Sequence, residues 1–285
     1  MVIINISGGI GNQMFQYAFG RYLSILFQKQ LLLNMTAYEN NGYRKFGLQT
    51  FQLAPKCRIV NRDEILLQDA PSSEYLQIDE RFYHFNQELV DLLRQMSEEN
   101  SCCQTRFLVS GYWQSEKYFK DIRPILKTDF GFRFPLVGQA KVLLNKIKSE
   151  NSVMIHVRRG DYLYFQDKYC IVSKEYLLSA IQYCWKELQS PVFYVFSDDI
   201  SWCKENLHEV PGLTFMGDEL YDEHSKSYLQ LMCACHHFIL SNSTFGWWAA
   251  WLGDHPGKIT IAPGRWFNDE LTNAKDVYCD DWIIM

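Results

Sequence analysis

Two adjacent arginines follow a run of β-forming residues near the middle of the chain. The segment "VMIHVRRGDY", residues 153–162, contains Arg158 and Arg159 and then Asp161. Because side chains alternate along a strand, His156 and Arg158 are expected on one face, with Arg158 pointing toward a ligand beyond the strand. Arg159 is expected to point elsewhere and to pair with a carboxylate such as Asp161, since charged groups are almost never buried unpaired.

Three interpretations of this segment are open from the residues alone. The arginines could form a purely structural ion pair, they could bind an anion, or the Arg-Gly-Asp tripeptide at residues 159–161 could be an adhesion motif. An adhesion motif requires an exposed extracellular loop, whereas this tripeptide follows an apolar strand in a chain that we expect to be cytoplasmic. The adhesion interpretation is therefore disfavoured.

A glycine-rich loop precedes the first predicted helix. Glycines at residues 8, 9 and 11 allow backbone N–H groups to approach a ligand closely, and the helix dipole favours an anion there. The Gly9-x-Gly11 spacing lacks the third glycine of a dinucleotide fingerprint, because Met14 stands at that position, so NAD binding is disfavoured. The alternative is a tight strand-to-helix turn without a ligand.

Two further polar groups stand where strands are predicted to end. The run "VFYVFSDD" ends in Asp198 and Asp199, which could accept hydrogen bonds from guanine, bind a metal ion or cap the next helix, and capping is expected for one of the two. In "LSNSTFGWWAAWL", residues 240–252, hydroxyl and amide groups crowd onto a helix N-terminus and form a second anion cradle. The tryptophans of this segment are expected in the core. The Cys233–His237 run lacks zinc-ligand spacing and is also expected in the core.

Composition narrows the class of protein. The 285 residues carry 28 basic and 33 acidic side chains, and this net charge of −5 argues against a general nucleic-acid or membrane-surface binder. The nine cysteines form no small disulfide framework, and the first residues have no basic region of a signal peptide. We expect a reducing, cytoplasmic location, with loose association with the inner face of the membrane left open. The sequence specifies no oligomeric state.

The elements that would position these groups alternate. Strands are expected at residues 2–6, 31–34, 106–111, 153–157, 192–196, 237–240 and 258–262, and helices at residues 12–28, 79–96, 139–148, 173–187, 227–235 and 244–252. This alternation predicts α/β architecture with parallel sheets covered on both faces. Segment 129–139, with two glycines and a proline, separates two such regions, so we predict domains at residues 1–135 and 136–285.

Five segments occur in order between residues 8 and 252: "GGIGNQMFQYAFGRYL", "GYWQSEKYF", "IHVRRGDY", "VFSDD" and "SNSTFGWWAAWL". Together they resemble the α-1,2-fucosyltransferases of glycosyltransferase family 11. The arginine-containing segment is also similar to one in the α-1,6- and protein O-fucosyltransferases. The resemblance implies a GT-B fold, in which two Rossmann-like domains face a cleft, with the acceptor on the N-terminal side and GDP-β-L-fucose bound by the C-terminal domain.

The resemblance also implies a reaction and its residues. Fucose would move, with inversion, to the 2-hydroxyl of a terminal β-galactose of an oligosaccharide, without a cofactor. By motif match Arg158 would hold the β-phosphate, His156 would line the nucleotide site, Asp199 would contact guanine and Asn12 would approach the reactive centre. The other predicted donor-binding residues are Asn242, Ser243, Thr244, Phe245, Gly9 and Gly11. No metal is expected, because the adjacent aspartates lack the D-x-D spacing of metal-dependent transferases.

The general base is unassigned at this stage. Related α-1,6 enzymes place a glutamate base a few residues beyond the aspartate, where this chain has Gln166 and Asp167. Asp161 has either a catalytic or a structural role, and His156 is a reserve candidate. Two alternative functions stay open, because fold alone excludes neither: a non-catalytic nucleotide- or sugar-binding module, and a GT-B transferase that uses another nucleotide sugar.

Overall fold

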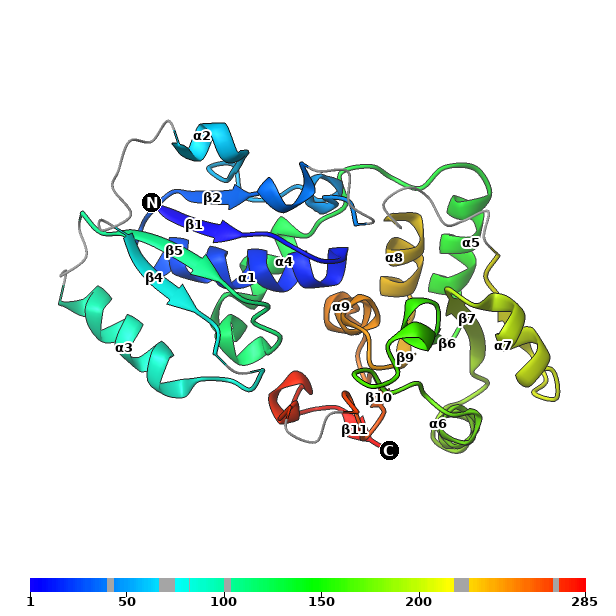
Figure 1. Cartoon of the computed structure of the whole chain (residues 1–285). Coiled ribbons are helices and arrows are strands. Elements are labelled where there is room, and N and C mark those ends of the chain that lie inside the picture. Colours follow the sequence, from blue (N-terminus) through cyan, green and yellow to red (C-terminus); the bar gives the residue numbers. More distant parts are fainter. Residues whose placement is uncertain (40–43, 67–74, 82, 100–103, 218–225, 269–271) are drawn as a thin grey trace. The chain divides into compact units, whose positions relative to one another are not determined.

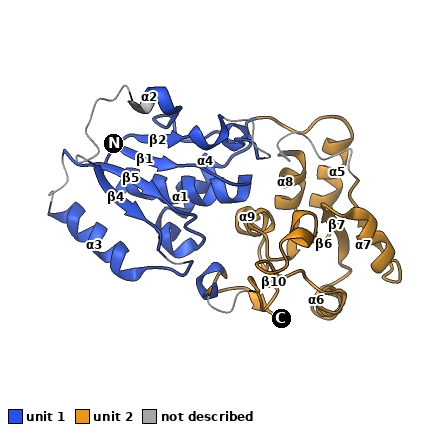
Figure 2. Ribbon diagram, viewed as in Figure 1, with its two compact units in different colours: residues 1–133, 273–277 blue, residues 134–272, 278–285 orange. Residues whose placement is uncertain are grey.

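A computed structural model describes residues 1–39, 44–66, 75–81, 83–99, 104–217, 226–268 and 272–285. The chain forms two compact units (Figure 2). Unit 1 consists of Met1–Arg133 and Asn273–Val277, and unit 2 consists of Phe134–Thr272 and Tyr278–Met285. The short segment Asn273–Val277 thus belongs to unit 1, although the sequence pattern places it in the second domain.

Unit 1 is built on a five-stranded parallel sheet (Figure 1). Its strands lie in the order β3-β2-β1-β5-β4. They are β1 (Val2–Asn5), β2 (Leu31–Asn34), β3 (Arg58–Val60), β4 (Tyr75–Asp79) and β5 (Arg106–Ser110). Strand β1 is central, with a partner strand on each side, and its side chains Val2, Ile3 and Ile4 are buried.

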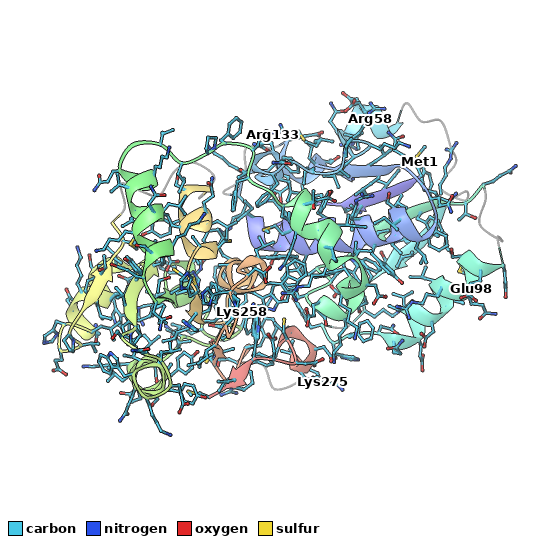
Figure 3. The ribbon with its side chains drawn as sticks, turned by 180° about the vertical axis from the view of Figure 1, so that it is seen from behind. Met1, Arg58, Glu98, Arg133, Lys258 and Lys275 are labelled. Carbon is cyan, nitrogen blue, oxygen red and sulfur yellow. The ribbon has the colours of Figure 1, made fainter. Side chains whose placement is uncertain are left out.

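The first helix of unit 1 is buried along most of its length. It is α1 (Ile10–Leu26), and its Phe19 ring stacks on the Trp113 ring with centroids 4.1 Å apart. Gln16, also on α1, donates a hydrogen bond to the main chain just after β5. The other helices of this unit are α2 (Arg62–Leu66), α3 (Gln87–Glu98) and α4 (Arg123–Asp129). Figure 3 shows Arg58 on β3 and Glu98 at the end of α3 on opposite edges of unit 1.

The single helix predicted at residues 79–96 is wrong. Strand β4 ends at Asp79, and α3 begins only at Gln87. The start is set by Asn86, whose side-chain oxygen accepts a hydrogen bond from the backbone N–H of Leu89 at 3.0 Å. Such an N-cap satisfies one of the backbone donors that the first turn of a helix leaves free.

Unit 2 contains a six-stranded parallel sheet in the order β11-β10-β9-β6-β7-β8. Its strands are β6 (Ser152–Val157), β7 (Val192–Ser197), β8 (Leu213–Phe215), β9 (His237–Ile239), β10 (Thr260–Ala262) and β11 (Ile283–Ile284). All six residues of β6 are buried, as expected of a central strand covered on both faces. This strand leads directly to the two arginines.

Helices cover both faces of this sheet, as the alternation predicts. They are α5 (Gly138–Ser149), α6 (Lys174–Glu187), α7 (Ile200–Asn206), α8 (Lys226–Cys233) and α9 (Thr244–Leu252). Ile155 and Val157 of β6 share a core with Leu177 of α6. On the other face, the Phe196 ring of β7 meets the Tyr228 ring of α8 edge-on, with centroids 5.3 Å apart.

The tryptophan-rich helix lies in the core, as predicted, whereas the cysteine-histidine run does so only in part: Cys235 and His237 are buried, and Cys233 and His236 are partly exposed. Trp247, Trp248 and Trp251 of α9 are at most 1% exposed. His237 uses both ring nitrogens, because Nε2 hydrogen-bonds Asn151 Oδ1 at 2.9 Å and Nδ1 accepts a backbone N–H at 3.1 Å. Its ring therefore has no lone pair left for a metal ion.

Two observations concern the described residues of both units. The cysteines in the described ranges are free thiols: Cys57, Cys170, Cys184, Cys203, Cys233, Cys235 and Cys279. Among the described helices, none is both long and apolar enough to cross a membrane.

Candidate functional site

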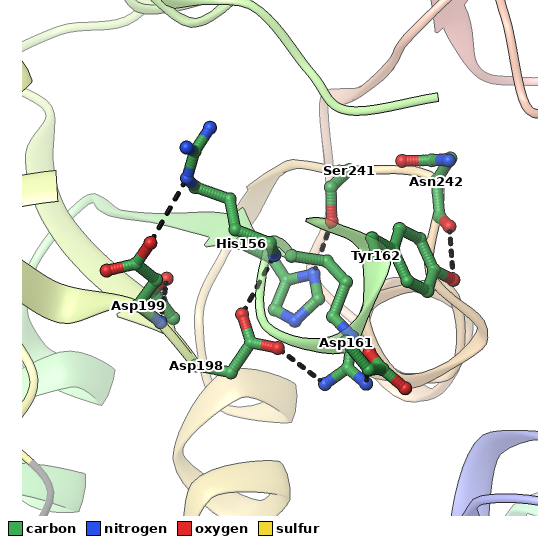
Figure 4. Close-up of polar contacts among 10 residues, drawn as sticks. His156, Asp161, Tyr162, Asp198, Asp199, Ser241 and Asn242 are labelled. Atoms are coloured by element: carbon green, nitrogen blue, oxygen red, sulfur yellow. Dashed lines mark hydrogen bonds and ion pairs between the residues drawn. The ribbon is translucent and has the colours of Figure 1, made fainter. Parts of the chain in front are cut away.

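Three loops follow neighbouring strands at the carboxyl edge of the unit 2 sheet. From β6 the chain continues to β7 and β8 on one side, and β9 lies on the other side of β6. The order in which successive strands are added to the sheet therefore reverses between β6 and β9. Ligands of open α/β sheets bind outside the carboxyl ends of the strands at such a point. The loops after β6, β7 and β9, here called the switch-point loops (residues 158–165, 198–199 and 240–243), carry the predicted side chains (Figure 4).

The guanidinium of Arg158 lies between two carboxylates. Its Nη2 donates to Asp161 Oδ1 at 2.5 Å, and its Nη1 lies 2.8 Å from Asp198 Oδ2. Its Cζ lies 5.4 Å from the centre of the Tyr162 ring. The Arg158 side chain is 18% exposed, so a ligand can still reach it. Arg159 pairs with a carboxylate as expected, but that carboxylate is Asp199, and Asp161, the example named, pairs with Arg158.

Gly160 allows the Asp198 carboxylate to pack directly against the backbone of the loop after β6. A Cβ at Gly160 would lie 2.4 Å from Asp198 Oδ2, nearer than real atoms approach. Asp198 Oδ1 also accepts the backbone N–H of Arg159 at 2.9 Å. One carboxylate therefore fixes both the side chain of Arg158 and the turn of the backbone after β6.

Arg159 binds a separate set of groups. Its Nε donates to Asp199 Oδ2 at 3.2 Å, and its Cζ lies 4.0 Å from the centre of the Trp202 ring. Asp199 Oδ1 also accepts the backbone N–H of Trp202 at 3.2 Å and so caps α7. The expectation that one of the two aspartates is a helix cap is confirmed. The cap is Asp199, the residue that the motif match assigns to guanine.

His156 is a buried, neutral side chain. Its Nδ1 lies 2.8 Å from Ser241 Oγ, which ties the end of β6 to the loop after β9. Helix α9 passes so close that a Cβ at Gly246 would lie 2.7 Å from this nitrogen. Burial, and then the charge of Arg158, lower the pKa of His156 to about 3. The ring is therefore uncharged at neutral pH and is a poor acceptor for a proton.

The loop after β9 leads polar groups into the start of α9. Asn242 Nδ2 donates to the Trp266 carbonyl at 2.8 Å, and the Asn242 carbonyl accepts from Tyr162 Oη at 3.1 Å. These contacts orient the Asn242 amide, whose Oδ1 is buried without a partner among the described residues. Ser243 occupies the N-cap position of α9, followed by Thr244 and Phe245. The first backbone N–H groups of a helix have no intrahelical acceptor, so they can bind an anion.

The remaining predicted residues belong to unit 1, where they follow β1. Gly8 has φ +76°, and a Cβ there would lie 2.8 Å from Asn12 Nδ2. Asn12 Oδ1 accepts a hydrogen bond from Gln114 Nε2 at 3.1 Å. Gly9 precedes α1, and Gly11 is buried within its first turn. These residues stand at the switch point of the unit 1 sheet, between β1 and β5.

Glu80 is a residue of this region that the sequence patterns missed. Its two carboxylate oxygens accept the backbone N–H groups of Tyr112 at 2.6 Å and Trp113 at 2.9 Å. Burial raises the pKa of Glu80 to about 7. A Cβ at Gly111 would lie 2.3 Å from the Glu80 Cβ. Because the partners lie 32 and 33 residues away, no local spacing marks Glu80 as the group that shapes this loop.

The chemistry of the unit 2 site is that of an anion site. Two guanidinium groups, a hydroxyl, an amide and the start of a helix surround the carboxyl end of β6. Across the described ranges, no three His, Cys, Asp or Glu side chains are arranged to hold a metal ion. The guanidinium groups and the helix start suit a phosphate, since planar guanidinium groups match its oxygens and helix N-termini favour its charge. Tyr162, Gly160 and Gly246 join the predicted residues as parts of this site.

Solved structures share the fold. The crystal structure of the fucosyltransferase NodZ from Bradyrhizobium matches with a TM-score of 0.53 and 14% identity, covering 91% of this chain and 94% of that one. The structure of POFUT1 in complex with GDP-fucose matches with a TM-score of 0.55 and 14% identity, covering 91% of this chain and 97% of that one. At this identity the likeness shows the fold alone, which is the GT-B fold with two parallel-sheet α/β domains, as predicted.

Sequence relatives extend over most of the chain. An alpha-1,2-colitosyltransferase from Escherichia coli is 30% identical over 99% of this chain and 98% of its own length. The human galactoside alpha-(1,2)-fucosyltransferase 1 is 32% identical over 86% of this chain and 64% of its own length. The family model described as glycosyl transferase family 11 matches residues 1–285. The chain therefore belongs to glycosyltransferase family 11 and is a glycosyltransferase.

Proposed function

We propose that the protein transfers L-fucose from GDP-β-L-fucose to the 2-hydroxyl of a terminal β-galactose on an oligosaccharide. The human and rabbit relatives are named as galactoside alpha-(1,2)-fucosyltransferases, and they align with 86% and 87% of this chain. An Escherichia coli relative named for O-antigen biosynthesis, 27% identical over 98% of this chain, supports an oligosaccharide acceptor. A β-configured donor and an α-linked product require inversion at the anomeric carbon.

The observation that carries the proposal is the position of Arg158. Its guanidinium stands at the carboxyl end of the central strand β6, beside the loop that leads into α9. When the bond from fucosyl C1 to the β-phosphate oxygen breaks, negative charge grows on the departing GDP. Donors fixed beforehand at that oxygen stabilise the transition state more than the ground state, and this difference is what accelerates the reaction.

The nucleotide base would lie toward the end of β7. A carboxylate has two oxygens with about four lone-pair directions. In Asp199 one oxygen accepts from Trp202 and the other from Arg159, which leaves capacity for the N1–H and amino group of guanine. A site that accepts two such bonds discriminates against bases that lack these donors, because its acceptor would then be left unpaired.

A second candidate donor is GDP-colitose. The relative named as an alpha-1,2-colitosyltransferase aligns with 99% of this chain at 30% identity, over a larger share of the chain than the mammalian fucosyltransferases. Colitose is fucose without the 3-hydroxyl, so both donors present the same GDP group and the same anomeric centre to unit 2. The two candidates therefore differ in the sugar pocket and share the role of Arg158.

The test is an incubation of the purified protein with lactose and either GDP-fucose or GDP-colitose. We expect GDP release and a new trisaccharide with GDP-fucose, in which two-dimensional NMR shows an α-1,2 linkage to galactose. Arg158→Met serves as the background control, because the activity must disappear with this side chain. Faster transfer from GDP-colitose would replace the proposed donor. GDP binding without transfer from either donor would point to another sugar nucleotide.

A further inference from the structure

Unit 1 has a switch point of its own, which the donor site of unit 2 leaves unused. Its sheet begins with β1, β2 and β3, and β5 is added on the other side of β1. The loop after β5, here called the β5 loop (residues 111–114), therefore lies beside the loop after β1, at an edge where open α/β sheets bind ligands. A transfer reaction has two substrates, so this second switch point is a candidate site for the acceptor.

The β5 loop has a conformation that its own residues do not favour. Trp113 has φ +58°, in the left-handed region that bulky side chains rarely adopt. Its ring is buried and meets the Tyr118 ring edge-on, with centroids 5.2 Å apart. Gly111 has φ +148°, and a Cβ there would collide with the Glu80 side chain. Such conformations persist only where the surrounding structure imposes them, and they cluster at ligand sites.

Glu80 is the group that imposes this conformation. Its carboxylate oxygens accept the backbone N–H groups of Tyr112 and Trp113, and its own N–H donates to the Ser110 carbonyl at 2.8 Å. An ionised carboxylate binds such N–H groups more strongly than a neutral acceptor does. Burial raises the pKa of this carboxyl to about 7, so the fold keeps it in place although burial disfavours its charged form.

The β5 loop brings two kinds of side chain to this edge of the sheet. Gln114 donates to Asn12 Oδ1 at 3.1 Å, so two side-chain amides meet there. The Tyr112 ring lies nearly parallel to the Tyr83 ring, at an angle of 11° with centroids 6.3 Å apart, and both residues are partly exposed. Amides suit hydroxyl groups, which both donate and accept, and aromatic faces suit apolar C–H groups. A β-galactose offers both, because the face opposite its axial 4-hydroxyl consists of C–H groups.

We propose that Glu80 is a positioning residue, which shapes the β5 loop so that Tyr112 and Tyr83 bind the apolar face of the acceptor galactose. The identity of this sugar rests on the proposed function. In this role Glu80 does not touch the substrate and acts through the main chain of the β5 loop. Its loss should therefore weaken binding of the acceptor and leave binding of GDP, which unit 2 provides, unchanged.

The first test compares Glu80→Gln with Asp129→Asn. Asp129 is a buried carboxylate of unit 1 with two hydrogen-bond donors, Tyr17 and Arg21, and it lies outside the β5 loop. Glutamine keeps the size of Glu80 but turns an amide N–H group toward a backbone N–H. At saturating GDP-fucose, Glu80→Gln should raise the KM for lactose about ten-fold or more, with a smaller change in kcat. Asp129→Asn should leave this KM within about two-fold of wild type, and calorimetry should give an unchanged GDP affinity in both variants.

The second test concerns the rings and stays informative if Glu80→Gln does not fold. Tyr112→Ala should raise the KM for lactose about two- to ten-fold, the range that an aromatic contact is worth. Tyr112→Phe keeps the ring and should stay within about two-fold of wild type. Saturation-transfer NMR with methyl β-galactoside should show the strongest contact at the C–H groups opposite the 4-hydroxyl, and this signal should disappear in Tyr112→Ala.

The positioning role and the proposed function can fail separately. A KM for lactose within about two-fold of wild type in Glu80→Gln would overturn the positioning role, and an equal rise in Asp129→Asn would reduce it to a general loss of stability. Equal losses in Tyr112→Phe and Tyr112→Ala would exclude binding on the ring. If the wild-type protein transfers no fucose, while methyl β-galactoside still binds through Tyr112, the proposed donor is wrong and the sugar site stands. If fucose is transferred and Tyr112→Ala has the wild-type KM, the sugar site is wrong and the proposed function stands.

Discussion

Replacing Gly246 by alanine tests how tightly α9 is fitted to His156. The new Cβ would lie 2.7 Å from His156 Nδ1, whereas ordinary contacts begin at 3.4 Å, so one partner must move by 3.4 − 2.7 = 0.7 Å. The ring cannot move freely, because it is buried and bonded to Ser241. Overpacking of this kind costs about 1–3 kcal/mol. The alanine returns up to about 1 kcal/mol of helix propensity, which leaves a net loss of roughly 1 kcal/mol.

Thermal unfolding and kinetics measure this effect. A loss of about 1 kcal/mol lowers the melting temperature by about 2–4 °C for a unit of this size. Helix α9 begins at the predicted donor site. A displacement of this helix by up to 0.7 Å should therefore also reduce turnover, by on the order of ten- to a hundred-fold.

The matched control is the same Gly246→Ala change in a His156→Ala background. With the ring removed, the methyl group has room, and the change should raise the melting temperature. The reasoning is refuted if Gly246→Ala has the same sign in both backgrounds, or if it leaves the wild-type protein as stable and as active as before.

Three further predictions follow from the charged groups. Arg158→Lys should lower turnover about a hundred- to a thousand-fold. Arg159→Lys loses the stacking on the Trp202 ring and should chiefly lower the melting temperature, by about 2–8 °C. Turnover numbers and melting curves of both variants measure this, and the reversed pattern would exchange the two roles. Activity should survive excess EDTA, because guanidinium groups and a helix N-terminus already oppose the phosphate charge; loss of activity restored by Mg²⁺ would contradict this. Stability to urea at pH 5 should be lower than at pH 7, by roughly 1–2 kcal/mol per pH unit. Burial lowers the pKa of His156 to about 3 and of His237 to about 4, so the unfolded chain binds more protons below about pH 6.5 and the stability present above that pH is lost as pH falls. Glu80 acts in the opposite sense, because its pKa is raised to about 7 and it therefore stabilises the folded protein as the pH falls. A midpoint of urea unfolding that is unchanged or higher at pH 5 would show that this carboxyl dominates.

The fold was predictable where local periodicity is strong. Strand β6 is buried on both faces, and its sequence is accordingly a nearly continuous run of β-forming residues. The alternation of side chains correctly separated His156 from Ile155 and Val157. Long amphipathic helices such as α6 were likewise found with nearly their observed bounds. Three of the shortest strands were missed: β3, β8 and β11 have only two or three residues, too few to show a period. The three-residue strands β9 and β10 were predicted, because each stands within a longer apolar run.

The pairing of the arginines could not be predicted for a different reason. Which carboxylate meets which arginine depends on the order of strands in the sheet, because that order brings the loop after β7 beside the loop after β6. Asp198 lies 40 positions beyond Arg158 in the chain. After the strand ends, alternation no longer fixes side-chain direction, since the turn at Gly160 redirects the backbone. The motif identified the residues of the site without their partners.

The return of residues Asn273–Val277 to unit 1 has a consequence for recombining this enzyme with its relatives. Within that segment, Asp276 accepts hydrogen bonds from Lys117 Nζ at 2.7 Å and from the Phe85 backbone N–H at 3.0 Å. A chimera joined only once, after Arg133, would take residues 273–277 from the other relative. The contacts of this segment with Lys117 and Phe85 would then be formed between residues of two different proteins. An exchange of the whole of unit 2 between family members therefore needs three junctions, with residues 273–277 inherited together with the first 133.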